Sequence, residues 1–244
     1  MDHGRRERER ECLGRQNYLR PERIGNTARL VTPIRGIIFD FNGTLSDDEP
    51  ILCEIFRGLF AEYGRPLSAQ EYYDGLAGLS DPEIVLTWLG REYSNVDAVV
   101  AQRVERYRAA VSDGSSVHEH VREAVRYAAE RVPLAICSGA ARAEIEPVVE
   151  AAGLASFFRG IISSDDVVDG KPHPEGYLKA LELIDGAPPG DVLGIDDTEA
   201  GVASAKAAGL VVFAKPGTLD PHRLAAADEL IERIDVELMR RVLG

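Results

Sequence analysis

Short apolar runs alternate with helix-like stretches along most of this chain. The first run, residues 34–39 (IRGIIF), ends in a polar loop that contains glycine, as buried strands often do. Four more runs of strand length follow, at 133–137, 160–162, 192–195 and 210–213. Apolar residues at helical spacing fill the intervals, at 119–130, 141–152, 175–184 and 199–208. This alternation predicts an α/β fold with a doubly wound parallel sheet and helices on both faces.

One segment interrupts the alternation. More than ninety residues separate the first two strands, which exceeds what a single crossover helix needs. Four stretches within this segment show helical spacing, at 50–63, 68–76, 81–93 and 97–111. We therefore expect a helical domain at 49–114, inserted between core segments 34–48 and 115–244. Residues 1–33 form a charged tail with little to bury, and we expect it to be poorly ordered.

The charge balance narrows the class of partners. The formal net charge of -13 would repel nucleic acid and anionic membranes. Apolar runs are strand-length, and the first ten residues are almost all charged, unlike a secretion signal. We therefore expect a cytoplasmic protein, a monomer or weak dimer, that acts on a small molecule. Three widely spaced cysteines predict neither a disulfide framework nor a zinc site.

Four polar motifs fall at or near the ends of predicted strands. They are DFNGTL at 40–45, CSG at 137–139, GKPHP at 170–174 and GIDDTEAG at 194–201. Each alone is also ordinary turn chemistry. Ligands of parallel sheets bind at the carboxyl ends of the strands, so the order of all four is informative. The adjacent Asp196 and Asp197 are costly at a strand end unless a cation such as Mg²⁺ offsets them.

Together these motifs resemble those of the haloacid dehalogenase superfamily of phosphatases and phosphomutases. The resemblance runs from about Ile34 to Phe213, and the helical insert matches the position of that superfamily's C1 cap. The runs DDEP at 47–50, GKPHPEGY and DDTEAGV look most like the β-phosphoglucomutase and phosphoglycolate phosphatase branch. The resemblance implies a Rossmann-like core and a magnesium-dependent hydrolase of a small phosphorylated metabolite.

The resemblance also implies a role for each motif. Asp40 looks like the nucleophile that becomes an aspartyl-phosphate. Phosphate-binding groups would be Thr44, Ser138, Gly139 and Lys171, with Lys171 also paired to Asp40. The metal would be held by Asp40, the main-chain carbonyl of Asn42, and Asp197, with Asp196 in support directly or through water.

Asn42 departs from the family pattern. Phosphate-processing members normally carry a second aspartate there, which gives and takes the proton. An amide can donate hydrogen bonds but cannot move a proton at neutral pH. Three interpretations stay open: a hydrolase that is slow or takes its proton elsewhere, a non-hydrolytic phospho-ligand binding protein, and an enzyme of other superfamily chemistry. A phosphosugar mutase is the nearest enzyme alternative, although it particularly needs that aspartate. Asn42-Gly43 is also a sequence prone to deamidation, which would restore an aspartate.

Several other residues have structural interpretations that we prefer. Glu49, His118 and His120 could supply a proton, but each is expected at the surface. Ser80-Asp81-Pro82 is expected to begin a helix rather than to bind substrate. The aromatic residues of the insert occur at helical spacing and are expected in its core, namely Tyr63, Tyr72, Tyr73, Trp88 and Tyr107.

Overall fold

The computed structural model describes residues 33–217 and 221–244, so the predicted tail at 1–33 lies almost wholly outside the described residues. The described chain divides into two compact units. The helical unit comprises residues 48–110, and the α/β unit comprises residues 33–47 and 111–244. The insert expected at 49–114 therefore starts one residue after the helical unit begins and ends four residues after it ends.

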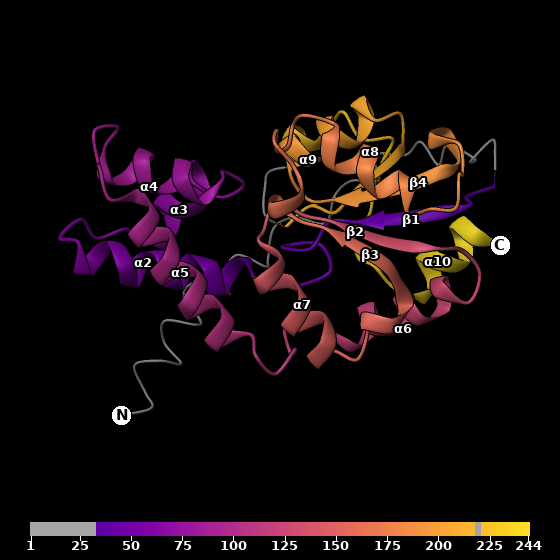
Figure 1. Cartoon of the computed structure of the whole chain (residues 1–244), viewed down its shortest axis with the longest axis horizontal. Helices are drawn as coiled ribbons and strands as arrows, with labels where there is room; N and C mark the ends of the chain where they lie inside the picture. Colours follow the sequence, from indigo (N-terminus) through magenta and orange to yellow (C-terminus); the bar gives the residue numbers. More distant parts are fainter. Residues whose placement is uncertain (1–32, 218–220) are drawn as a thin grey trace. The chain divides into compact units, whose positions relative to one another are not determined.

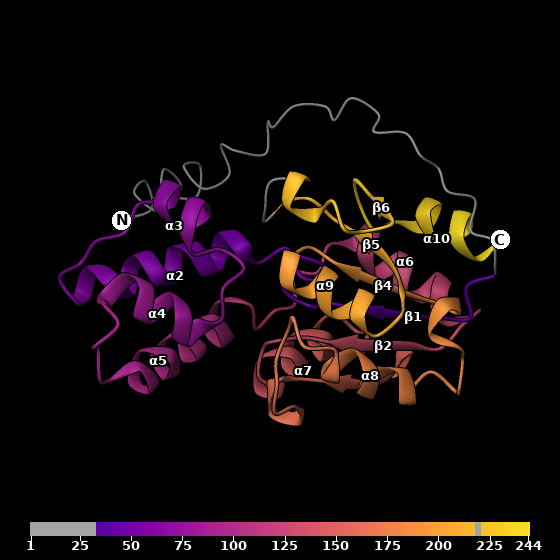
Figure 2. The same ribbon diagram turned by 90° about the horizontal axis from the view of Figure 1, so that it is seen from above.

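The α/β unit contains a six-stranded sheet in which every neighbouring pair is parallel. The strand order is β3-β2-β1-β4-β5-β6. Figure 2 labels β2, β1, β4, β5 and β6 of this order, seen from above. The strands are β1 Gly36–Phe39, β2 Leu134–Cys137, β3 Phe158–Ile162, β4 Val192–Asp196, β5 Val211–Ala214 and β6 Glu229–Leu230. The central position of β1 explains its unbroken apolar run, because both of its faces are covered and its residues are fully buried.

Helices cover both faces of this sheet, as predicted. Helices α8 (Glu175–Glu182) and α9 (Glu199–Ala207) lie on one face in Figure 1. Helices α6 (Glu119–Ala129), α7 (Arg142–Ala151) and α10 (Val236–Leu243) lie on the other. Short 3₁₀ turns occupy Ala155–Phe157, Ser164–Asp166, Pro189–Asp191 and Pro221–Leu224. None of the described helices is long and apolar enough to cross a membrane.

Close packing under α8 and α9 depends on glycines. A β-carbon at Gly36, at the start of β1, would lie 2.1 Å from the Ile184 side chain. A β-carbon at Gly176 in α8 would lie 3.0 Å from Cys137 Sγ on β2. The core between these helices and the sheet is otherwise built from small and branched apolar side chains, including Ile38, Ala135, Ala180, Val202 and Ala205. The helices are thereby seated directly on the strands whose ends carry the polar motifs.

The helical unit consists of α2 Glu49–Glu62, α3 Ala69–Gly75, α4 Asp81–Leu89 and α5 Val96–Ala110. Its core packs α2 against α5 through Phe56, Leu59, Val99 and Tyr107, which are almost completely buried. The α3 helix begins with a capping box in which Glu71 accepts from Ser68 N and Ser68 Oγ accepts from Glu71 N. Helix α4 begins at Asp81, as the Ser80-Asp81-Pro82 sequence predicts.

Two predictions about the helical unit need correction. Glu49 is not a solvated surface residue, because it is part-buried and accepts a hydrogen bond of 2.9 Å from Tyr72 Oη. Tyr72 and Tyr107 are core residues as expected, but Tyr63, Tyr73 and Trp88 are only part-buried. Trp88 Nε1 donates to the Arg65 carbonyl at 2.8 Å, and this hydrogen bond keeps the indole near the surface.

Candidate active site

The loop after β1 places Asp40 at the carboxyl edge of the sheet. Asp40 N donates to Ile195 O at 2.8 Å, which holds the loop level with the end of β4. Gly43 adopts a φ of 72°, a conformation that favours glycine, and this lets the chain turn back. Two side chains from distant segments fix the turn. Thr44 Oγ1 donates to Asp197 Oδ1 at 3.0 Å, and Lys215 Nζ donates to Gly43 O at 2.7 Å.

Lys171 bridges two of the buried carboxylates. Its Nζ lies 2.5 Å from Asp40 Oδ1 and 2.7 Å from Asp196 Oδ2. The Asp196 side chain is fully buried, and those of Asp40 and Lys171 are 8% and 14% exposed. Buried ion pairs of this kind hold their partners only when the remaining hydrogen-bonding positions are satisfied. The geometry therefore fixes the lysine ammonium directly beside the predicted nucleophile.

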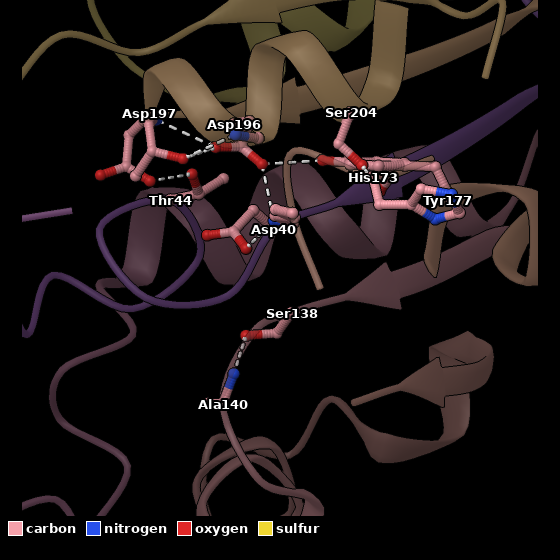
Figure 3. A network of polar contacts seen from close by, with 12 residues as sticks. Asp40, Thr44, Ser138, Ala140, His173, Tyr177, Asp196, Asp197 and Ser204 are labelled. Atoms are coloured by element: carbon pink, nitrogen blue, oxygen red, sulfur yellow. Dashed lines mark hydrogen bonds and ion pairs between the residues drawn. The ribbon is translucent and has the colours of Figure 1, made fainter. Parts of the chain in front are cut away.

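Asp196 accepts four hydrogen bonds, two at each carboxylate oxygen. Its Oδ1 accepts from Thr198 N at 2.9 Å and from Thr198 Oγ1 at 2.8 Å. Its Oδ2 accepts from Lys171 Nζ and from Tyr177 Oη, the latter at 2.8 Å. A β-carbon at Gly201 would lie 2.0 Å from this carboxylate, so the glycine of the GIDDTEAG motif makes room for it. Figure 3 shows Asp40, Thr44, Asp196 and Asp197 drawn together at the sheet edge.

The electrostatics of the group follow from its burial. Burial raises the pKa of Asp40 well above its usual value, the Lys171 ammonium opposes that rise, and Asp196 and Asp197 add to it. Burial disfavours the charged form of Lys171, but the Asp196 and Asp40 carboxylates outweigh it and raise the Lys171 pKa well above its usual value. Lys171 is therefore an ammonium at neutral pH. Its single positive charge cannot neutralise the three carboxylates of Asp40, Asp196 and Asp197.

Ser138 and Gly139 follow β2, the strand beside β1. The register pairs Phe39 with Ile136, so both loops leave the sheet at the same edge. Ser138 is buried and its Oγ accepts from Ala140 N at 3.1 Å, which Figure 3 draws apart from the carboxylate group. Burial raises the pKa of the preceding Cys137 thiol to about 12. This neutral thiol is therefore not a nucleophile of the site.

The structure thus brings together five of the predicted residues. Lys171 pairs with Asp40 and Asp196, Thr44 donates to Asp197, and oxygens of the three aspartates lie within 4.8 Å of one another. Sequence reasoning missed Tyr177 and Lys215, which bind Asp196 and the nucleophile loop. Tyr177 lies on the apolar face of α8 and resembles a core residue in the sequence. His118 is exposed, as expected, and pairs with Asp47 at 2.9 Å. His120 is part-buried rather than at the surface, and its ring stacks on that of His118.

The carboxylate group has the composition of a site for a hard divalent cation. Asp40, Asp196 and Asp197 each offer an oxygen within 4.8 Å of the others, and all three side chains are buried. One ammonium among three buried carboxylates leaves negative charge that is costly without a further cation. Carboxylate and carbonyl oxygens are the ligands that Mg²⁺ prefers. The residues present therefore fit such an ion.

Known proteins similar to this chain are hydrolases and phosphatases. Residues 34–209 match the model of a haloacid dehalogenase-like hydrolase. A phosphoglycolate phosphatase of Yersinia pseudotuberculosis is 30% identical over 184 residues, covering 72% of this chain and 78% of that protein. A phosphorylated carbohydrates phosphatase of Thermotoga maritima is 28% identical, covering 72% and 82% respectively.

Solved structures show the same fold. An aspartate-to-asparagine variant of CbbY from Rhodobacter sphaeroides, in complex with xylulose 1,5-bisphosphate, superposes with a TM-score of 0.74. It is 26% identical and the match covers 86% of this chain and 99% of that one. A β-phosphoglucomutase from Clostridium difficile, 17% identical, matches with a TM-score of 0.72 over 86% and 97% of the two chains. The chain belongs to the haloacid dehalogenase-like hydrolases.

Proposed function

We propose that this hydrolase is a magnesium-dependent phosphatase that cleaves a small phosphorylated metabolite through an aspartyl-phosphate on Asp40. The observation that carries the proposal is the buried Asp40–Lys171–Asp196 bridge, with Asp197 beside it. The relatives named as phosphatases of phosphoglycolate and of phosphorylated carbohydrates support a small anionic substrate. They favour a sugar phosphate or a short phosphorylated acid.

In the first half of the reaction the Asp40 carboxylate attacks phosphorus. A bond forms from Asp40 to phosphorus, the bond to the substrate oxygen breaks, and that oxygen takes its proton from solvent water, because Asn42 cannot deliver one. Lys171 uses two of its three N–H donors on Asp40 and Asp196 among the described residues, and the third can meet a phosphoryl oxygen. Ser138 and the Gly139 N–H would bind the other phosphoryl oxygens. These contacts act on the charge that develops during transfer.

Magnesium would be held by Asp40, Asp197 and the Asn42 carbonyl. When bound, it supplies positive charge that lets a phosphate dianion approach the carboxylates. We assign Asp196 to Lys171 instead of the metal, because its two oxygens already accept four hydrogen bonds. Thr44 holds Asp197 through its hydroxyl and so orients the carboxylate that would meet the ion.

In the second half, water attacks phosphorus, inorganic phosphate leaves and the Asp40 carboxylate is restored. That water loses its proton to solvent water, because Asn42 cannot accept it. The substitution slows both the departure of the leaving group and the hydrolysis of the aspartyl-phosphate, by about 10²–10⁴-fold for a lost acid–base group. The enzyme is therefore expected to turn over slowly, and fastest on esters whose leaving groups need little protonation.

Asn42 also favours a second candidate of another class, a protein that binds a phosphorylated ligand without turnover. Nucleophile, lysine and metal ligands would then serve recognition only. A mutase is less compatible with Asn42, because it must move a proton in both directions of transfer.

Turnover of p-nitrophenyl phosphate separates these candidates. The wild-type protein should release p-nitrophenol only with added Mg²⁺, and EDTA should stop the reaction. Asp40→Asn should lower the rate of p-nitrophenol release at least about 10³-fold, because no other group forms the covalent intermediate. Equal rates for wild type and Asp40→Asn, together with retained binding of inorganic phosphate, would establish the binding protein instead.

A further inference from the structure

Tyr177 contacts both members of the ion pair that supports the nucleophile. Its hydroxyl donates to Asp196 Oδ2 at 2.8 Å, and Lys171 Nζ lies 5.3 Å from the centre of its ring. The side chain is completely buried in α8. One residue thus provides a hydrogen bond to the carboxylate and an aromatic face to the ammonium.

The Tyr177 hydroxyl decides how Asp196 Oδ2 is shared. Thr198 occupies Oδ1 with two donors, so Oδ2 is left to Lys171 and Tyr177. A carboxylate with about four acceptor positions is then saturated and has one favoured orientation. Without the tyrosine hydroxyl, Lys171 would be the single described donor to Oδ2. The ammonium would then move toward Asp196 and away from Asp40, because a buried acceptor short of donors is costly.

Packing around the ring makes the contact rigid. A β-carbon on Gly194 of β4 would lie 3.7 Å from Tyr177 Cε1, so the strand approaches the ring at van der Waals distance. The neighbouring Gly176 brings α8 still closer to β2, since a β-carbon there would lie 3.0 Å from Cys137 Sγ. A ring packed against β4, on a helix that lies this close to β2, has little freedom to adjust, which suits a group that sets the position of another.

We propose that Tyr177 is a positioning residue of the hydrolytic site. It fixes the orientation of Asp196 and thereby holds Lys171 Nζ against Asp40. The predicted change in kcat rests on the proposed function. The predicted position of Lys171 rests only on contacts within the α/β unit. Tyr177 does not touch the reacting phosphorus; it acts through Lys171, whose charge matters most during phosphoryl transfer.

Tyr177→Phe tests the proposal, because it keeps the ring and removes only the hydroxyl. With Mg²⁺ and p-nitrophenyl phosphate, kcat should fall about tenfold while KM stays within about twofold, the expected result for one lost hydrogen bond to a charged group that acts in transfer. Tyr107→Phe is the matched control. Tyr107 is a fully buried tyrosine whose hydroxyl donates to a buried aspartate, Asp48, in the helical unit. The kcat of Tyr107→Phe should stay within about twofold of the wild-type value.

A purely structural role predicts a different result, in which both variants lose thermal stability alike and neither changes kcat. Wild-type kcat in Tyr177→Phe would overturn the proposal. If the wild-type protein itself shows no magnesium-dependent turnover, the proposed function fails, and the position of Lys171 then decides the inference. Crystal structures of wild type and Tyr177→Phe should show Lys171 Nζ displaced from its 2.5 Å contact with Asp40 in the variant only. An unchanged contact would refute the inference independently of activity.

Discussion

The two units of this protein contain similar sets of buried polar groups in two arrangements. At the sheet edge of the α/β unit, Asp40, Asp196 and Asp197 accompany one lysine and one tyrosine. In the helical unit three carboxylates accompany one arginine and two tyrosines: Asp48 accepts from Tyr107, Glu49 from Tyr72, and Asp81 pairs with Arg103 at 3.2 Å.

The difference lies in whether the oxygens converge. At the sheet edge, oxygens from three carboxylates lie within 4.8 Å of one another, and two of the carboxylates share one ammonium. Among the described residues of the helical unit no three carboxylates converge in this way. Burial raises the Glu49 pKa to about 7, with the Tyr72 hydrogen bond opposing the rise and Asp48 adding to it. The first arrangement has the composition that fits a bound cation, and in the second the raised pKa lets Glu49 hold a proton near neutral pH. The two arrangements therefore differ in where the carboxylates are placed, and not in how many there are.

The largest expected effect comes from removing the shared cation. Lys171→Met should lower kcat about a thousandfold, because Asp40 and Asp196 lose their common partner and the developing phosphoryl charge loses its donor. Steady-state rates at saturating Mg²⁺ measure this effect. Lys206→Met, which removes an exposed partner of Asp228, is the control and should keep full activity. A Lys171→Met enzyme with more than about a tenth of wild-type kcat would contradict the assigned role.

Removing Arg103, a buried cation of the helical unit, should affect stability instead. Arg103 is 5% exposed and pairs with Asp81, so Arg103→Met should lower the free energy of unfolding by about 3 kcal/mol. Arg106→Met breaks the exposed pair with Glu62 and should cost much less stability, because solvent screens that pair. Urea unfolding followed by circular dichroism compares the two variants. Equal losses would mean that burial does not distinguish these pairs.

Asn42→Asp should give the proposed active site the acid–base group that it lacks. The new carboxyl can carry a proton, so kcat should rise about 10²-fold while the helical unit is untouched. Asn42→Ala should give no such rise. Mass spectrometry must first show that wild-type Asn42 is intact, because deamidation would create the same residue. If Asn42→Asp gains nothing, the assignment of slow turnover to Asn42 is wrong.

The smallest effect concerns the proton held by Glu49. Because its pKa rises from 4.5 to about 7 on folding, the folded chain keeps a proton that the unfolded chain releases between these values. The free energy of unfolding should therefore fall as pH rises through this window and level off above it. Glu49→Gln can still accept from Tyr72, and should be about 1–2 kcal/mol more stable than wild type at pH 8 but not at pH 4. Glu105→Gln, at an exposed position of the same unit, should show no such gain.

The sequence predicted those parts of the fold that depend on local pattern. Five strands and the helices between them follow apolar periodicity, and the motif residues follow from their place at strand ends. Strand β6 was missed because Glu229–Leu230 is only two residues long and is defined by its pairing with β5. No periodicity marks such a strand.

The missed site residues depend on contacts between distant segments. In the sequence Tyr177 looks like a residue of an apolar helix face, and only the fold shows its hydrogen bond to Asp196. Lys215 likewise looks like a surface lysine, and only the fold shows its hydrogen bond to the Gly43 carbonyl. Glu49 was misjudged for the same reason, since its burial depends on Tyr72 in the next helix. Gly201 carries a clearer signal, because a glycine in the first turn of a helix requires a packing reason.

The contacts that fix the nucleophile loop join segments far apart along the chain. Lys171 and Asp40 are separated by 131 positions, Asp197 and Thr44 by 153, and Lys215 and Gly43 by 172. During synthesis, Asp40 leaves the ribosome long before any of these partners exists. Such non-local contacts form slowly and late, because a long loop must close before they contribute. The buried carboxylates thus become crowded together only when the sheet is nearly complete, so a nascent or partly folded chain avoids their mutual repulsion.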